Sequence, residues 1–183
     1  RARFPLYYEN MMVAGPRVKE VAESIGLKDW DISDYEPLPE WKPCAAYATS
    51  GDFDLKACNF RIATHSMSWT AENPCLAEVA ELNPYAQKIL LNTKTAKRKG
   101  ISNRDKICVE SSVGKVMGEA KVTECIHPEA IGISSHFGTL SRGKPVACGK
   151  GVNWNKLVPY NTDPVSTGID GCVRVKVYKV FRL

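Results

Sequence analysis

A cluster of polar side chains between residues 59 and 78 has the composition of an anion-binding site. It offers hydroxyls, an imidazole, a guanidinium and an amide, from Arg61, Thr64, His65, Ser66, Ser68, Thr70 and Asn73. Oxyanions are bound by many converging donors, and the start of a helix adds backbone N–H groups and partial positive charge. We therefore predict a cradle for an anion or a nucleotide. The same residues fit a helix cap and a polar turn equally well.

Two regular elements are expected to hold this cluster in place. Residues 52–63 can form a strand, and an apolar-periodic segment at residues 75–82 is typical of a short helix. A polar connection between the end of a strand and the start of a helix would bring its donors together at one end of the fold.

A second polar stretch precedes the last predicted strand, and four of its residues are further candidates for ligand binding. Gly151 allows a close approach of the backbone to a ligand, and Asn153 and Asn155 offer both donors and acceptors to the edge of a heterocycle. Asp163 can accept hydrogen bonds from a guanine-like ring. The alternative is an ordinary loop with an Asx turn at Asp163, which composition alone favours.

Bulk composition places the chain among globular proteins. It has 183 residues, 44% hydrophobic and 25% charged, which fits one domain with or without an arm. A net charge of +5 suits an anionic ligand and is too small to predict nucleic-acid binding. We find neither a secretory-signal pattern nor an apolar run of membrane-spanning length in the sequence. Because it opens without Met, we expect a piece of a longer polypeptide or a mature form.

The cysteines and histidines do not indicate a metal site in this chain. Seven cysteines are scattered without a Cys-x-x-Cys pair, so we expect neither a zinc site nor an iron–sulfur cluster, and we expect most of the thiols to be buried. His127 and His136 are predicted to be structural residues with satisfied hydrogen bonds. His65 is the exception, because of its polar neighbours.

Residues 1–45 are predicted to be an arm that enters a β-rich domain spanning residues 46–183. Residues 4–8 are strand-like, and Val18, Val21, Ala22 and Ile25 predict a short helix that Gly26 ends. The proline-rich residues 30–43 predict a loop.

The β-rich part is predicted to be a compact closed barrel with inserted helices. Strands are expected at residues 88–92, 105–110, 115–124, 131–134 and 171–181, and a helix at 93–100. Thr93 is the expected N-cap of that helix and Gly100 its left-handed C-terminal residue. Lys97, Arg98 and Lys99 are expected to form its solvated last turn.

Four sequence blocks, in order, resemble the C-terminal domain of the molybdopterin oxidoreductases (the dimethyl sulfoxide reductase superfamily). The match covers roughly residues 50–181. The blocks are Phe60-Arg61 to Glu78, Asn92-Thr93 to Gly114-Lys115, Val122-Thr123 to His127-Pro128-Glu129, and Gly151-Val152-Asn153 to Gly168 with Val173-Arg174-Val175. Ala-Glu-Asn-Pro-Cys-Leu-Ala-Glu at 71–78 is most similar to the polysulfide, thiosulfate and arsenate reductase branch.

The resemblance implies a six-stranded double-psi β-barrel that closes over a molybdopterin guanine dinucleotide. Residues Arg61 to Thr70, with Asn73, would line the pterin and the pyrophosphate, and the loop from Asn153 to Asp163 would hold pterin or guanine edges. The full enzymes carry molybdenum or tungsten. Their metal-ligand residue and iron–sulfur cluster lie in earlier domains, and many pair with an iron–sulfur electron-transfer subunit. The isolated domain is not expected to be catalytic.

One departure and one alternative accompany this resemblance. The family has Gly-Asp where this chain has Arg104-Asp105, which leaves the form of that turn open. The alternative function is a non-enzymatic barrel module that binds a protein or a polyanion through the cations between Lys94 and Arg104. A self-processing decarboxylase on the same barrel would need a Gly-Ser pair, which the sequence lacks.

Overall fold

Six short strands with buried apolar side chains close into one barrel. The computed structural model describes residues 8–38, 40–42, 44–48, 51–160 and 162–180. The strands are β1 (Leu55–Phe60), β2 (Ile89–Leu91), β3 (Lys106–Glu110), β4 (Lys115–Val122), β5 (Ala130–Ser134) and β6 (Val173–Lys179). Five lie within segments predicted to be extended, and β5 begins one residue before the predicted segment 131–134, so the predicted β-rich barrel is confirmed.

The strand pairings are those of a double-psi barrel. The closed order is β1-β5-β2-β4-β3-β6. Parallel pairing joins β1 to β5 and β2 to β4, and the other four neighbouring pairs are antiparallel. Exchanging every strand for the one three places along the chain reproduces the same pairs with the same directions. The two three-stranded halves are therefore interlocked, and the predicted double-psi topology is confirmed.

The barrel core is filled by residues that alternate along the strands. In β6, Val173, Val175 and Val177 are buried between partly exposed cations. Leu55 of β1 and Ile131 of β5 are fully buried. Since β2 and β5 are buried along their whole length, they read as continuous apolar runs rather than alternating ones.

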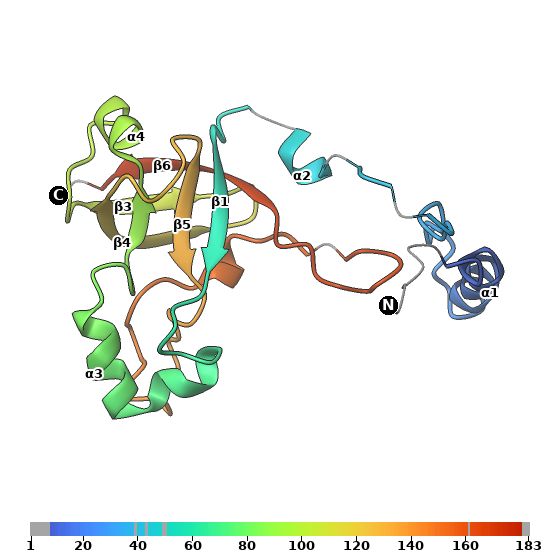
Figure 1. Ribbon diagram of the computed structural model, residues 1–183, viewed down its shortest axis with the longest axis horizontal. Coiled ribbons are helices and arrows are strands. Elements are labelled where there is room, and N and C mark those ends of the chain that lie inside the picture. Colours follow the sequence, from blue (N-terminus) through green and yellow to red (C-terminus); the bar gives the residue numbers. More distant parts are fainter. Residues whose placement is uncertain (1–7, 39, 43, 49–50, 161, 181–183) are drawn as a thin grey trace, which may run out of the picture. The chain divides into compact units, whose positions relative to one another are not determined.

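Short helices cover the two ends of the barrel. In Figure 1, β1 and β5 both point toward the end that carries α3 (Pro74–Leu82), and α4 (Thr93–Arg98) lies at the other end. The predicted N-cap of α4 was wrong by one residue. Asn92 has the extended backbone of a cap and accepts a hydrogen bond from the Lys94 N–H at 2.9 Å, whereas Thr93 is already helical.

The C-terminal end of α4 follows the prediction. Gly100 has a φ of +64°. The Gly100 N–H donates to the Lys97 carbonyl, and the Ile101 N–H donates to that of Ala96, which forms a Schellman motif. Lys99 and Arg98 contact the Asp54 carboxylate at 2.9 and 3.7 Å.

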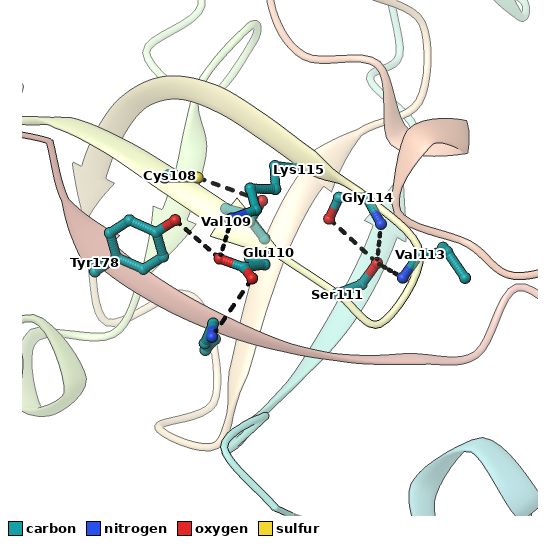
Figure 2. A network of polar contacts seen from close by, with 9 residues as sticks. Cys108, Val109, Glu110, Ser111, Val113, Gly114, Lys115 and Tyr178 are labelled. Atoms are coloured by element: carbon teal, nitrogen blue, oxygen red, sulfur yellow. Dashed lines mark hydrogen bonds and ion pairs between the residues drawn. The ribbon is translucent and has the colours of Figure 1, made fainter.

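A hydrogen-bonded hairpin joins β3 to β4 and is fastened to β6. The Ser111 hydroxyl accepts from the N–H groups of Val113 and Gly114, both at 3.2 Å (Figure 2). Glu110 accepts a hydrogen bond from the Tyr178 hydroxyl at 2.9 Å and contacts Lys115 at 3.1 Å. The Glu110 carboxylate accepts a hydrogen bond from the Tyr178 hydroxyl and lies near the cations Lys115 and Lys176. Its pKa therefore lies below the usual value. These contacts tie β3, β4 and β6 together.

The turn before β3 holds a non-glycine residue, Arg104, in a left-handed conformation. Arg104 has a φ of +71°, the left-handed region that favours glycine. Its N–H donates to the Ala120 carbonyl at 2.8 Å, and the Ala120 N–H donates back to the Asp105 carbonyl at 2.9 Å. The paired backbone therefore holds Arg104 in a conformation that costs about 1 kcal/mol for a non-glycine residue.

Residue contacts divide the chain into two units. One contains Arg1–Pro43 and Tyr160–Asp170, and the other contains Cys44–Pro159 and Gly171–Leu183. The barrel unit also carries α2 (Ala45–Ala48) and the short 3-10 helices η1 (Ser68–Glu72) and η2 (Trp154–Lys156). The predicted boundary at residue 45 stays a prediction.

The first unit contains α1 (Met11–Ser24), which starts earlier than the apolar pattern predicted. Gly26, with a φ of +90°, follows it as expected. The Tyr35 hydroxyl donates to the Pro164 carbonyl at 2.9 Å. Most of the predicted strand at residues 4–8 lies outside the described residues. No described helix combines the length and the apolar character that crossing a membrane requires.

The prediction that most cysteines are buried was wrong. Cys108 is buried in β3, but Cys58, Cys75 and Cys125 are exposed and the others are partly buried. Cys58 shows the reason: the inward positions of β1 are Leu55 and Ala57, so Cys58 lies on the outward face.

Candidate functional site

The parallel pairing of β1 and β5 brings two polar segments together. Phe60 and Ser134 are partners in the register, so both strands end at the same level. The Ser135 N–H then donates to the Phe60 carbonyl at 3.0 Å. Residues 61–73 and 135–139 therefore leave the barrel at one end, the end near α3 (Figure 1).

A third segment, the loop before η2, is hydrogen-bonded to both of these polar segments. The Gly138 N–H donates to the Lys150 carbonyl at 2.7 Å, and the Gly149 N–H donates to the Thr139 carbonyl at 2.9 Å. Both carboxylate oxygens of Glu72 accept from the adjacent N–H groups of Val146 and Ala147, at 3.1 and 3.0 Å. The loop before η2 is thus fixed to both of the other segments.

Two buried histidines lie where these segments meet. His65 and His136 are 4% and 2% exposed, with ring centroids 5.8 Å apart, and Phe137 packs edge-on against both rings. The His65 Nδ1 lies 3.0 Å from the Thr70 hydroxyl. Three buried ring nitrogens, His65 Nε2 and both nitrogens of His136, have no hydrogen-bond partner among the described residues. Such groups are costly unless something else binds them.

Both imidazoles are held in the neutral state. Burial lowers the pKa of His65, although its contact with Thr70 acts in the opposite direction. Burial also lowers the pKa of His136, and the neighbouring charges of His65 and Arg61 lower it further. At neutral pH each ring therefore offers one N–H donor and one acceptor.

A polar pocket of about 200 Å³ opens beside His136. All three segments line it: Ser68 and Ala71, then Ser135 to Phe137 with Thr139 and Lys144, and Asn153 to Asn155. Three predicted site residues, Ser68, Asn153 and Asn155, are thereby brought together. The Asn153 side-chain oxygen accepts the Asn155 N–H at 3.1 Å, which leaves its amide N–H groups free to donate to a ligand.

Glycines make the close approach of these segments possible. A Cβ on Gly151 would lie 2.5 Å from the Phe137 Cβ, and one on Gly138 would lie 2.1 Å from the Asn153 nitrogen. Both residues have positive φ, +68° and +92°. Gly151 packs against Phe137, and its predicted role, a close approach of the backbone to a ligand, stays a prediction.

The other predicted residues of the first cluster do not line the pocket beside His136. One of them caps a helix, others are exposed, and one has a buried hydroxyl. Asn73 caps α3 by accepting the Leu76 N–H at 3.2 Å, so the helix-cap interpretation is correct for this residue. Arg61 and Ser66, in the connection after β1, are exposed. The Thr64 hydroxyl is buried without a partner among the described residues.

Asp163 belongs to the unit that contains Arg1–Pro43 and Tyr160–Asp170, and not to the barrel unit. Its carboxylate accepts the N–H groups of Val165 and Ser166 at 3.1 and 2.6 Å. This is the Asx turn that composition favoured. These hydrogen bonds hold the pKa of the Asp163 carboxyl below its usual value.

Sequence reasoning missed His136, Phe137, Thr139 and Lys144. His136 was predicted to be a satisfied structural residue, which was wrong because neither ring nitrogen finds a partner among the described residues. One signal was present in the sequence: His136 follows its strand as His65 does, and parallel strands deliver such residues to the same end. That signal required knowing that β1 and β5 are parallel neighbours.

Comparisons with known proteins match the part of the chain that contains these three segments. The family model described as "Molydopterin dinucleotide binding domain" matches residues 55–171. The thiosulfate reductase molybdopterin-containing subunit PhsA of Salmonella typhimurium is 29% identical over 120 residues, which are 66% of this chain and 15% of that protein. The structure of acetylene hydratase from Pelobacter acetylenicus matches with a TM-score of 0.63 and 18% identity, covering 87% of this chain and 22% of that one.

Proposed function

Because the chain belongs to the molybdopterin dinucleotide-binding domain family, we propose that it holds this cofactor in a molybdenum or tungsten oxidoreductase. The cofactor is a molybdopterin guanine dinucleotide, and the chain is one domain of the catalytic polypeptide. One observation carries the assignment of the site: three separate segments converge on a polar pocket beside two buried histidines, three of whose ring nitrogens have no partner among the described residues.

The residues present suit the dinucleotide chemically. A pterin and a guanine present both donors and acceptors along their edges, which matches neutral imidazoles and side-chain amides. A pyrophosphate needs donors and positive charge, and Lys144 and Arg61 supply them. Binding would also satisfy the buried nitrogens of His136, whose isolation is otherwise unfavourable.

Each group has a specific task in this proposal. His136 and Asn153 donate to heterocycle or phosphate oxygens, and Lys144 contributes charge at the rim of the pocket. Phe137, edge-on to both histidines, excludes water from their rings. When bound, the cofactor supplies two-electron redox chemistry at its metal, while the protein supplies binding and orientation.

The rest of the enzyme belongs to the proposal as well. The chain spans about 15% of the thiosulfate reductase subunit that it matches, so further domains are expected to carry the metal ligand and an iron–sulfur cluster. An iron–sulfur electron-transfer subunit is the expected partner. Similarity to that subunit agrees with placing the parent in the polysulfide, thiosulfate and arsenate reductase branch.

The alternative of a non-enzymatic binding module has less support. The family match favours cofactor binding. The basic segment invoked for polyanion binding is partly neutralised, since Arg98 and Lys99 contact Asp54.

The test is the cofactor content of the parent polypeptide purified without oxygen. We expect molybdenum or tungsten by elemental analysis, pterin fluorescence after oxidation, and guanosine monophosphate after acid hydrolysis. His136→Gln should lower the pterin content several-fold, because it replaces a buried ring that lines the pocket.

His127→Gln is the matched control, since His127 is exposed and its Nδ1 only accepts the Glu129 N–H at 3.2 Å. Its pterin content should equal that of the wild type. A parent protein without metal and without pterin would refute the proposed function. Equal pterin contents in the two variants would refute only the assignment of His136.

A further inference from the structure

The left-handed backbone of Arg104 coincides with a side chain that has no partner. Arg104 is exposed, and its guanidinium makes no hydrogen bond or ion pair with any described residue. A glycine would adopt the φ of +71° without strain. Residues held in such conformations are concentrated at functional sites, and the exposed Arg104 guanidinium is accessible to a ligand.

Arg104 lines a pocket of about 380 Å³ together with two lysines. Lys88 precedes β2, Lys121 lies on β4, and Arg104 precedes β3, and all three line this cavity. Pro84, Asn103, Glu119 and Ala120 complete the lining. Lys121 is held over the Tyr85 ring, with its Nζ 5.8 Å from the ring centroid. The hydrogen-bonded turn and the β2–β4 pairing fix the backbones that carry these cations.

The charge of this cavity, here called the Arg104 pocket, is positive. Its lining contains three cations and one carboxylate, Glu119, which contacts Lys88 at 3.0 Å. Arg104 and Lys121 are therefore left with uncompensated charge. The Asn103 side-chain oxygen accepts the Val122 N–H at 3.0 Å, so its amide N–H groups remain available to donate.

We propose that the Arg104 pocket binds the phosphate group of a small anion. A guanidinium fork pairs with two phosphate oxygens, and the ammonium of Lys121, which also lines the pocket, neutralises further charge. The pocket is formed by residues other than those around His136, and it does not involve the α4 cations that contact Asp54. It is a second anion site, and its existence does not depend on the proposed cofactor function.

The experiment measures phosphate binding to the full 183-residue chain at low ionic strength, by calorimetry and thermal unfolding. Arg104→Gly removes the guanidinium and suits the turn. It should raise the melting temperature of the free protein and weaken inorganic phosphate binding about tenfold or more. Arg104→Lys keeps the charge without the fork and should bind with intermediate affinity. Lys121→Gln should weaken binding similarly to Arg104→Gly.

Lys97→Gln is the charge-matched control, because Lys97 is an exposed cation of α4 outside the pocket. It should bind phosphate as the wild type does. Acetate at equal ionic strength should not stabilise the protein. Guanosine monophosphate binding more tightly than inorganic phosphate would identify a nucleotide as the source of the group, and equal affinity would identify free phosphate.

Three outcomes would overturn the proposal. The first is wild-type phosphate affinity in Arg104→Gly. The second is an equal loss in Lys97→Gln, which would reveal a simple effect of net charge. The third is no phosphate binding by the wild-type chain. Cofactor content plays no part in this readout, so failure here leaves the proposed function untouched.

Discussion

At the scale of single residues, the pair of buried histidines is the chemically most informative feature. Their rings are nearly inaccessible and three of their four nitrogens lack partners among the described residues. Their one hydrogen-bonding contact, between His65 Nδ1 and the Thr70 hydroxyl, leaves the other three nitrogens unsatisfied among the described residues. The presence of this pair is better explained by a bound partner, and the polar pocket beside His136 is where that partner would enter.

The histidines should make the stability of the free chain depend on pH. Their folded-state pKa values lie below the usual value near 6.5. As the pH falls below about 6.5, the unfolded chain therefore binds protons that the folded chain does not. The free energy of unfolding should decrease by up to about 1.4 kcal/mol per pH unit for each histidine. Urea denaturation at pH 7.5, 6.5 and 5.5 measures this slope.

A variant separates this effect from other titrations. His136→Gln should reduce the slope, because it removes a buried group whose pKa is lowered. The carboxylates of Asp105 and Glu110 have lowered pKa values and stabilise the fold above their unfolded-state values near 4, so their contribution is lost at lower pH. Identical slopes in the wild type and His136→Gln would contradict the assignment.

At the scale of elements, the site depends on how closely three loops approach one another. Gly138 and Gly149 both have positive φ, yet only Gly138 faces a neighbouring backbone. A Cβ on Gly138 would lie 2.1 Å from the Asn153 nitrogen, whereas none of the surrounding atoms lies within 4 Å of a Cβ on Gly149. A substitution at Gly149 therefore tests backbone strain alone, whereas a substitution at Gly138 tests backbone strain together with steric packing.

Alanine at each glycine tests this distinction. Gly149→Ala should cost about 1 kcal/mol, the price of a left-handed alanine. Gly138→Ala should cost more than about 3 kcal/mol, because the loop carrying Asn153 must move away. Thermal and urea unfolding measure both values. Similar losses in the two variants would mean that the loops are not packed as described.

At the scale of the whole molecule, the barrel presents one side of a site. The pocket beside His136 holds about 200 Å³, which is small for a complete dinucleotide, and the chain covers a small part of its relatives. Ligands of that size are usually buried over most of their surface. The remaining contacts are therefore expected from other domains of the parent polypeptide.

The isolated 183-residue chain should accordingly lose the cofactor readily. When it is mixed anaerobically with dinucleotide released from a molybdoenzyme and passed over a gel-filtration column, the pterin should elute separately. The parent polypeptide should retain its pterin under the same conditions. Pterin that co-elutes stoichiometrically with the isolated chain would show that this domain holds the cofactor without help.

The sequence determined the barrel strands and several local features, whereas the chemistry of the first polar cluster stays a prediction. Alternation in Val173, Val175 and Val177 and the turn at Ser111 predict strands and a hairpin from local periodicity alone. The Gly100 helix end and the cap on α3 are likewise local, because their hydrogen bonds join residues a few positions apart. The ordered blocks added the family and its barrel.

Tertiary structure decided which residues meet. His65 and His136 are 71 positions apart, and only the parallel pairing of β1 with β5 places them 5.8 Å from each other. The loss of hydrogen-bond partners at His136 is a property of its surroundings, so no local pattern could reveal it. The Arg104 pocket likewise draws Lys88 and Lys121 from separate segments. Local periodicity fixes strands and turns, whereas long-range pairing fixes the site.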